Sequence, residues 1–346
     1  MIKIGIICPS EIAFRRFLPA LKKTDNFEYV GIATPNQGNW FEKIENQNSD
    51  IEKANYILSN EREKALQIIQ TYGGKLFYSY ESIIESEEID ALYIPLPPAL
   101  HYKWTKLALL KGKHVLVEKP FTTECSDTEE LIDIAKQNNL AVHENYMFAF
   151  HNQIQQINEI IESGEVGDVR LYKISFGFPQ RDANDFRYNK ELGGGALLDC
   201  GGYTIKYASF LLGETAKIVY AQSNYIDSFE VDMYGSGALK NANGMVVQIT
   251  FGMDNDYKCE LEVWGSKGTL INRRVLTAPD GFMPEILLRK GNSEEMRKLS
   301  VDDAFHKSIE HFQTCIKNTD ERNTNYQQIL KQAKLVDDFK VQANYK

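Results

Sequence analysis

The stretch KIGIICPSEIAFRRFLPALKK, residues 3–23, decides the fold of the first part of the chain. Its apolar run Ile4–Ile7 predicts a buried strand, and the apolar residues between Phe14 and Leu21 recur at helical spacing. A strand, a tight turn and a helix are the opening unit of a dinucleotide-binding fold, whose turn normally carries glycines. Here the turn reads Cys8-Pro9-Ser10, which raises the question of whether it can still hold a pyrophosphate.

The donors of such a site are backbone N–H groups at the start of the helix, and glycines only allow a closer approach. Ser10 can cap the helix and leave the amides of Glu11 and Ile12 pointing outward, whereas Pro9 has no N–H. Taken alone, the turn fits a phosphate cradle and a purely structural connection equally well.

The end of the second predicted strand bears on the type of dinucleotide. Thr34, Pro35 and Asn36 carry no acidic side chain, so a ribose 2′-phosphate would not be repelled there. Arg15 and Arg16 lie on the neighbouring helix, although they can equally be solvated surface residues. These features favour NADP(H), with NAD(H) as the alternative.

Further along the chain, the element types change near Val166. Before it, strands alternate with helices, which predicts a doubly wound parallel sheet (Ile2–Ile7, Tyr29–Ala33, Ala91–Pro95, His114–Val117 and a strand near 140–146). After it, long β-rich segments predict a mostly antiparallel sheet with one embedded helix (169–178, 217–226, 244–253 and 257–265, with the helix near 196–212). We therefore expect a dinucleotide-binding domain over 1–122 and a second domain over 123–346. The composition of the polar segment 36–60 indicates an insertion or an extended helical excursion. The pattern over 325–339 predicts an amphipathic helix.

Composition limits the possible partners and the compartment. A length of 346 residues suits about two domains, and a net charge of −9 argues against a nucleic-acid partner. No stretch approaches the roughly 20 apolar residues of a membrane span, and no secretory signal layout precedes the first strand. The five cysteines are scattered without CxxC spacing, so neither a disulfide framework nor a metal site is indicated. We expect a cytoplasmic protein.

Two sequence motifs contain candidate catalytic residues. In GKHVLVEKP, residues 112–120, a strand ends in Glu118-Lys119-Pro120, at the sheet edge where parallel folds bind ligands. In LGGGALLDCGGYTIKYASFLLGE, residues 192–214, Asp199 and Tyr203 share a helix face. An ammonium near a tyrosine stabilises its phenolate, which makes the tyrosine a possible proton donor. Each motif alone is also compatible with a structural role.

The glycine pair inside the second motif is a further signal. Gly201 and Gly202 would each cost the helix about 1 kcal/mol relative to alanine. A close approach of another backbone or of a flat ring would justify that cost.

Together these motifs, with YIPLPPALH (93–101) and EVWGSKGTL (262–270), resemble in order and spacing the Gfo/Idh/MocA family, over nearly the full chain. Within it, the chain looks most like the NDP-hexose 3-ketoreductases of deoxysugar biosynthesis. The resemblance implies a Rossmann domain followed by an α/β domain with an open, mostly antiparallel sheet. That sheet commonly forms homodimers or homotetramers in the family.

The resemblance also implies roles for individual residues. Lys119 takes the place of the family lysine, Tyr203 that of the proton carrier and Asp199 that of the motif aspartate. Leu96, Pro97 and His101 fall where relatives contact the nicotinamide half of the cofactor. Arg181, Arg187 and Tyr188, in the loop before the glycines, are candidate contacts to the sugar or nucleotide part of the substrate, with a solvated loop as the alternative.

The implied activity is transfer of hydride from NAD(P)H to a keto group of a nucleotide-activated sugar. Two alternatives remain open: a dehydrogenase of a free sugar, polyol or dihydrodiol, and a catalytically degenerate sensor or scaffold. Cys8 departs from the family's pattern, since even the ketoreductases usually keep glycine there, and the usual Ser-Arg after the second strand is absent.

Overall fold

A computed structural model describes residues 1–36 and 48–345, which fall into two compact units. The first unit comprises Met1–Thr122, Ser126–Asn145 and Ile309–Gln327, and the second comprises Thr123–Cys125, Tyr146–Ser308 and Gln328–Lys346. The chain therefore enters each unit more than once. Residues 37–47 of the polar segment lie outside the described residues, and its remainder begins helix α3 (Asn48–Tyr72).

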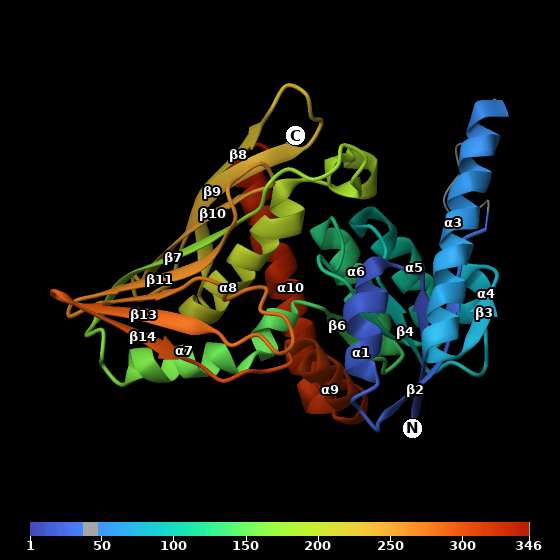
Figure 1. Cartoon of the computed structure of the whole chain (residues 1–346), viewed down its shortest axis with the longest axis horizontal. Helices are drawn as coiled ribbons and strands as arrows, with labels where there is room; N and C mark the ends of the chain where they lie inside the picture. The colour runs from blue at the N-terminus through green and yellow to red at the C-terminus, as the bar shows by residue number, and fades with distance from the viewer. Residues whose placement is uncertain (37–47, 346) are drawn as a thin grey trace. The chain divides into compact units, whose positions relative to one another are not determined.

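The first unit is built on the parallel sheet that the alternating pattern predicts. Six strands lie in the order β3-β2-β1-β4-β5-β6, and every neighbouring pair is parallel. Figure 1 labels β2, β3, β4 and β6 of this sheet. Their bounds are β1 (Ile2–Ile7), β2 (Phe27–Ala33), β3 (Lys75–Phe77), β4 (Ala91–Ile94), β5 (His114–Val117) and β6 (Val142–Glu144). Of the two central strands, β4 is buried along its whole length and β1 is buried from Ile4 to Ile7, as apolar runs require in a sheet covered on both faces.

Helices cover this sheet with large side chains. They are a π-helical turn (Ala13–Phe17) that continues into α1 (Leu18–Leu21), then α3, α4 (Tyr80–Ile84), α5 (Pro98–Leu110), α6 (Cys125–Gln137), the later part of α9 (Ala304–Lys317) and the first part of α10 (Thr319–Gln342). Phe17 stacks on Tyr93 of β4 with ring centroids 3.9 Å apart, and Phe312 of α9 stacks on Phe27 of β2 at 6.0 Å. Helix α9, which follows most of the second unit in sequence, thus packs on the sheet of the first unit.

The second unit contains an eight-stranded sheet in the order β14-β13-β12-β11-β7-β10-β9-β8. All its neighbouring pairs are antiparallel except β7 with β10, so the prediction of a mostly antiparallel sheet is confirmed. The bounds are β7 (Val169–Gly177), β8 (Lys217–Tyr225), β9 (Asp232–Lys240), β10 (Val246–Gly252), β11 (Lys258–Gly265), β12 (Thr269–Asn272), β13 (Glu285–Lys290) and β14 (Ser293–Lys298). The strands β9, β12, β13 and β14 were not among the segments that the sequence predicts.

Helix α8 (Gly202–Leu212) packs on β7, β9 and β10, and a π-helical turn (Leu197–Gly201) leads into it. The unit also contains α7 (Asn152–Glu162) and the later part of α10 (Thr319–Gln342), both labelled in Figure 1. A Cβ on Gly202 would lie 2.3 Å from the hydroxyl of Tyr146, and one on Gly201 would lie 3.2 Å from the ring of Phe251. The expectation that close approach of a flat ring explains the glycine pair is confirmed.

In the described part of the chain, no helix combines the length and apolarity that a membrane span needs.

Candidate active site

The turn after β1 has the backbone shape of a glycine turn although it contains none. Cys8 has a φ of 78°, in the left-handed region that glycine adopts most readily. Ser10 caps the following helix, since its Oγ accepts the amide of Ala13 at 3.2 Å. The amides of Glu11 and Ile12 precede that bond in the first helical turn, where no intrahelical carbonyl reaches them. The turn therefore keeps the backbone shape and the helix cap that the predicted pyrophosphate site needs.

The side chain of Cys8 points into the first unit, where it is 5% exposed. Its Sγ donates to Oε2 of Glu61 at 3.5 Å, and Oε1 of Glu61 accepts Nζ of Lys64 at 2.6 Å. Burial, together with the nearby carboxylate, raises the pKa of the Cys8 thiol, so it stays protonated and remains a donor. Glu61 of α3 thus stabilises the cysteine that replaces the usual glycine.

Of the residues predicted to select the dinucleotide, Arg15 lies on the surface and Thr34 is buried. Arg15 is exposed and pairs with Glu11 of the same helix at 2.6 Å. Thr34 is buried, and its amide donates to the carbonyl of Phe77 in β3 at 2.9 Å. No carboxylate belongs to the β2 end itself, Thr34–Asn36. The first unit therefore combines a capped helix after β1 with a strand end that carries no acidic side chain, two features that suit an NADP-type dinucleotide.

Lys119 follows β5 and is partly buried between two buried neighbours in sequence. Glu118 turns inward, where its Oε1 accepts both the hydroxyl of Tyr93 and the amide of Asn145 at 2.7 Å. Burial raises the pKa of Glu118. Glu118 therefore joins the ends of three strands, β4, β5 and β6, and its carboxylate is occupied within the first unit.

His101 is fully buried on α5, and both of its ring nitrogens face backbone carbonyl oxygens. Nδ1 lies 2.8 Å from the oxygen of Pro120 and Nε2 lies 2.7 Å from that of Leu96. Both polar atoms of the ring therefore lie against the protein's own backbone, and the cofactor contact predicted for His101 stays a prediction. Leu96 is buried and Pro97 partly buried beside it, at the end of β4.

In the second unit, Tyr203 is 8% exposed and lies among aromatic rings. Tyr146 and Phe176 meet it edge to face, at centroid distances of 5.0 and 5.3 Å, and Phe148 lies 5.8 Å away. These contacts fix the ring of Tyr203. The neighbouring ammonium of Lys206 lies over the ring of Tyr146, at 5.6 Å, and donates to the carbonyl of Gln328 at 3.3 Å.

Asp199 and Arg187, predicted for separate roles, form an ion pair. Nε of Arg187 lies 2.7 Å from Oδ2 of Asp199, and Nη1 lies 3.1 Å from Oδ1 of Asp185. Desolvation opposes the charge of the guanidinium, but the two carboxylates outweigh it and raise the pKa of Arg187. Asp199 thus holds the loop before the glycines against the π-helical turn.

The other two predicted loop residues also interact with each other. Tyr188 is buried, and its hydroxyl accepts the amide of Arg181 at 2.7 Å. Arg181 is exposed, with its guanidinium 4.9 Å from the ring centroid of Phe178. Of the predicted loop residues, Arg181 has the most accessible charge.

Sequence reasoning missed Asp232 of β9, which is fully buried behind the glycine run. Its Oδ2 accepts the amide of Leu197 at 2.9 Å and its Oδ1 accepts the hydroxyl of Tyr345 at 2.7 Å. A Cβ on Gly195 would lie 2.4 Å from Oδ1, so this glycine leaves room for the carboxylate. Burial raises the pKa of Asp232 to about 6. The position carries no local motif that would have revealed it.

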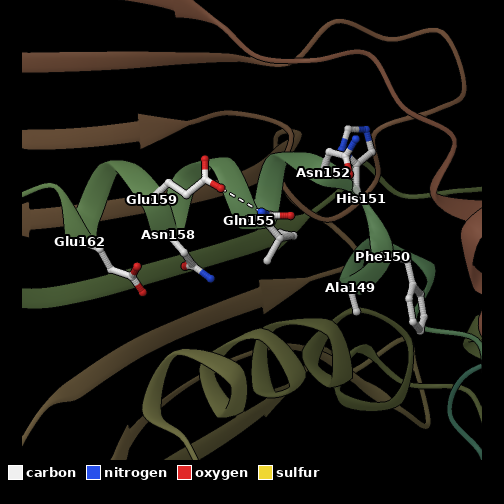
Figure 2. A pocket seen from close by; sticks show the side chains of 9 residues that line it. Ala149, Phe150, His151, Asn152, Gln155, Asn158, Glu159 and Glu162 are labelled. Atoms are coloured by element: carbon white, nitrogen blue, oxygen red, sulfur yellow. Dashed lines mark hydrogen bonds between the residues drawn. The ribbon is translucent and has the colours of Figure 1, made fainter. Parts of the chain in front are cut away.

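An open depression of about 480 Å³ runs along α7, as Figure 2 shows. Its lining is polar and acidic toward the end of the helix, where Glu159 accepts the amide of Gln155 at 2.9 Å. The described residues that line it include none of those predicted to bind cofactor or substrate (Ala149, Phe150, His151, Asn152, Ile154, Gln155, Asn158, Glu159 and Glu162). This depression is therefore separate from the candidate active site.

Comparison with known proteins assigns both halves of the chain. Residues 2–146 match the oxidoreductase family with an NAD-binding Rossmann fold, and residues 154–271 match the GFO/IDH/MocA C-terminal domain. A dTDP-3,4-didehydro-2,6-dideoxy-alpha-D-glucose 3-reductase from Actinomadura kijaniata is 33% identical over 336 residues, 97% of this chain and 94% of that protein.

Solved structures agree with this assignment. The crystal structure of a 3-ketoreductase from Actinomadura kijaniata, in complex with NADP and TDP-benzene, superimposes with a TM-score of 0.86. That enzyme is 32% identical to this chain, and the match covers 97% of this chain and 96% of the other. An aldose-aldose oxidoreductase from Caulobacter crescentus, 22% identical, shares the fold with a TM-score of 0.82 over 99% of this chain and 97% of the other. The chain belongs to the Gfo/Idh/MocA family of oxidoreductases.

Proposed function

We propose that this protein reduces a keto group of a nucleotide-activated deoxysugar, at C3, with NADPH as the hydride source. The observation that carries the proposal is the match to a dTDP-sugar 3-reductase along 97% of the chain. Three features of the described residues support it: a phosphate turn with glycine geometry, a lysine at the end of β5, and a tyrosine fixed by aromatic rings.

In this proposal the first unit holds the dinucleotide. The amides of Glu11 and Ile12 bind the pyrophosphate, and the exposed guanidinium of Arg15 binds the ribose 2′-phosphate. Leu96 and Pro97 contact the nicotinamide half through their backbone. NADPH supplies a hydride to the carbonyl carbon of the sugar when bound.

The chain's own contribution to the reaction is proton transfer and charge stabilisation. Tyr203 donates its phenolic proton to the carbonyl oxygen, and the ammonium of Lys119 stabilises the developing negative charge. Asp199 acts through Arg187, because its Oδ2 holds Nε of that guanidinium at 2.7 Å. Arg181 and Tyr188 border the substrate, with Arg181 available for its phosphates.

The open face of the second sheet is the proposed surface for homodimers or homotetramers. The side chains of Tyr220, Tyr234 and Trp264, from three different strands, are 50%, 44% and 53% exposed. Exposed aromatic residues on a sheet are typical of protein interfaces. Sedimentation equilibrium of the purified protein tests this, and a monomer at every concentration would contradict it.

The substitution Tyr203→Phe tests the chemical proposal. We expect turnover of a dTDP-3-keto-deoxysugar to fall by about 10² to 10⁴, the range for positioned acid catalysis, with NADPH affinity nearly unchanged. Tyr207→Phe is the matched control, because Tyr207 is on the same helix, is fully buried, and its hydroxyl has no hydrogen-bond partner among the described residues. Equal turnover of Tyr203→Phe and Tyr207→Phe would refute the role of Tyr203.

Substrate and cofactor titrations separate the alternatives. Turnover of a free sugar, polyol or dihydrodiol without turnover of the nucleotide sugar would favour a dehydrogenase of small substrates. Fluorescence titration that detects binding of neither NADPH nor NADH would favour a sensor or scaffold.

A further inference from the structure

The backbone that follows Lys119 is attached to the rest of the first unit on both sides. His101 of α5 faces the carbonyl of Pro120, and Glu144, the last residue of β6, accepts the amide of Phe121 through Oε1 at 2.9 Å. Both side chains are at least nine-tenths buried. Two consecutive residues after Lys119 are therefore held by buried polar groups from two other elements.

The ring of His101 also reaches a second loop. Its Nε2 faces the carbonyl of Leu96, so one imidazole spans the loops that follow the adjacent parallel strands β4 and β5. Burial lowers the pKa of His101 to about 4, which leaves the ring neutral near pH 7. A neutral ring has one N–H and can donate to only one of the two carbonyls. We assign this N–H to Nδ1, which then donates to the carbonyl of Pro120, while the unprotonated Nε2 lies beside the carbonyl of Leu96 without a hydrogen bond.

This arrangement fixes a residue whose own side chain is less enclosed. Glu118 before Lys119 is held by Tyr93 and Asn145, while Pro120 and Phe121 after it are held by His101 and Glu144. Lys119 itself is more exposed than its neighbours in sequence. Since loops ordinarily move more than strands, such attachment on both sides restricts where the lysine backbone can lie.

We propose that His101 and Glu144 are positioning residues, which act through the backbone of Pro120 and Phe121 to hold the Lys119 ammonium in its catalytic place. The inference rests on the proposed function of Lys119. A misplacement of about 1 Å at a catalytic group can lower a rate by 10²-fold, so the effect is measurable.

Two conservative variants of His101 make the test specific. The amide nitrogen of asparagine occupies the region of Nδ1, so His101→Asn can keep the contact with Pro120. The amide nitrogen of glutamine occupies the region of Nε2, so His101→Gln keeps only the contact with Leu96. We expect kcat to fall by about 10-fold to 100-fold in His101→Gln and by at most about threefold in His101→Asn. KM for NADPH should stay within about twofold in both variants.

Thr105→Val is the control for substitution inside α5. Thr105 is fully buried, its hydroxyl has no hydrogen-bond partner in the described part of the chain, and valine has its shape. The control should leave kcat unchanged. The pair Glu144→Gln and Glu144→Leu repeats the test on the other side, because only glutamine keeps an oxygen that can accept the amide of Phe121.

The same measurements in a Lys119→Met background distinguish positioning from loss of stability. Single-turnover rates should show no further loss when His101→Gln is added to Lys119→Met, because the positioned group is already absent. Equal kcat for His101→Asn and His101→Gln, or a His101→Gln defect that persists without Lys119, would overturn the inference. Full activity of Lys119→Met alone would instead refute the proposed function of Lys119.

Discussion

Gly202→Ala should destabilise this protein, although alanine ordinarily stabilises a helix. The glycine lies at the start of α8, and a Cβ there would be 2.3 Å from the hydroxyl of Tyr146. That hydroxyl cannot move aside easily, because Tyr146 is 1% exposed and its ring meets Tyr203 edge to face at 5.0 Å.

The magnitude follows from two opposing effects. Alanine gains about 1 kcal/mol over glycine in helix propensity, whereas overpacking a buried site costs about 1–3 kcal/mol. The net expectation is a loss of about 1 kcal/mol. In a Tyr146→Phe background the nearest remaining atom is Cζ of the same ring, at 3.4 Å, an ordinary contact distance. Gly202→Ala should then stabilise by about 1 kcal/mol, which reverses the sign.

Urea unfolding of the wild type, the two single variants and the double variant measures this cycle. The coupling free energy between residues 146 and 202 should be about 2 kcal/mol. Turnover should also fall in Gly202→Ala and rise again in the double variant, because Tyr146 contacts the proposed proton donor Tyr203. A Gly202→Ala variant more stable than wild type, or a coupling below about 0.5 kcal/mol, would refute the reasoning.

Two further predictions concern the first unit. Cys8→Val should lower the free energy of unfolding by about 2 kcal/mol, because a β-branched residue strains a backbone with a φ of 78° and loses the thiol contact with Glu61; wild-type stability by urea unfolding would contradict this. Burial, with a smaller contribution from the charge of Arg322, lowers the pKa of His114 to about 4, below its unfolded value of about 6.5. The stability that this gives is present above pH 6.5 and lost as the pH falls toward 4, so wild type should lose about 2 kcal/mol more than His114→Gln between pH 7 and pH 5. Parallel unfolding curves for the two proteins at both pH values would show that His114 does not titrate in this way.

Local patterns predicted the parts of the fold whose signal lies within a few residues. The runs Ile2–Ile7 and His114–Val117 are strands because continuous apolar segments suit a sheet covered on both faces. The strand β9 escaped prediction because Gly235 and Gly237 weaken its β pattern. Their reason is tertiary: a Cβ on Gly235 would lie 2.5 Å from the ring of Phe251, and one on Gly237 would lie 2.8 Å from Phe339.

The candidate site, like the fold, was predictable only where the signal is local in sequence. Lys119, Asp199 and Tyr203 were recognisable as candidates because each belongs to a short motif at an element end. The residues that support the turn after β1 and the loop after β5 were not recognisable. Glu61 lies 53 residues from Cys8, and Glu144 lies 23 residues from Phe121. The topology of the sheet brings such pairs together, and no local pattern in either segment indicates the other.

The return of residues 309–327 to the first unit determines when that unit can be finished during synthesis. Phe312 stacks on Phe27, and Asn325 and Tyr326 donate to carbonyl oxygens of Val142 and Leu140, beside the edge strand β6. A ribosome has made the whole second sheet before it reaches these residues. The nascent nucleotide-binding half must therefore wait for the last tenth of the polypeptide, and a fragment ending at residue 145 would leave Phe27 and the edge strand β6 without these partners.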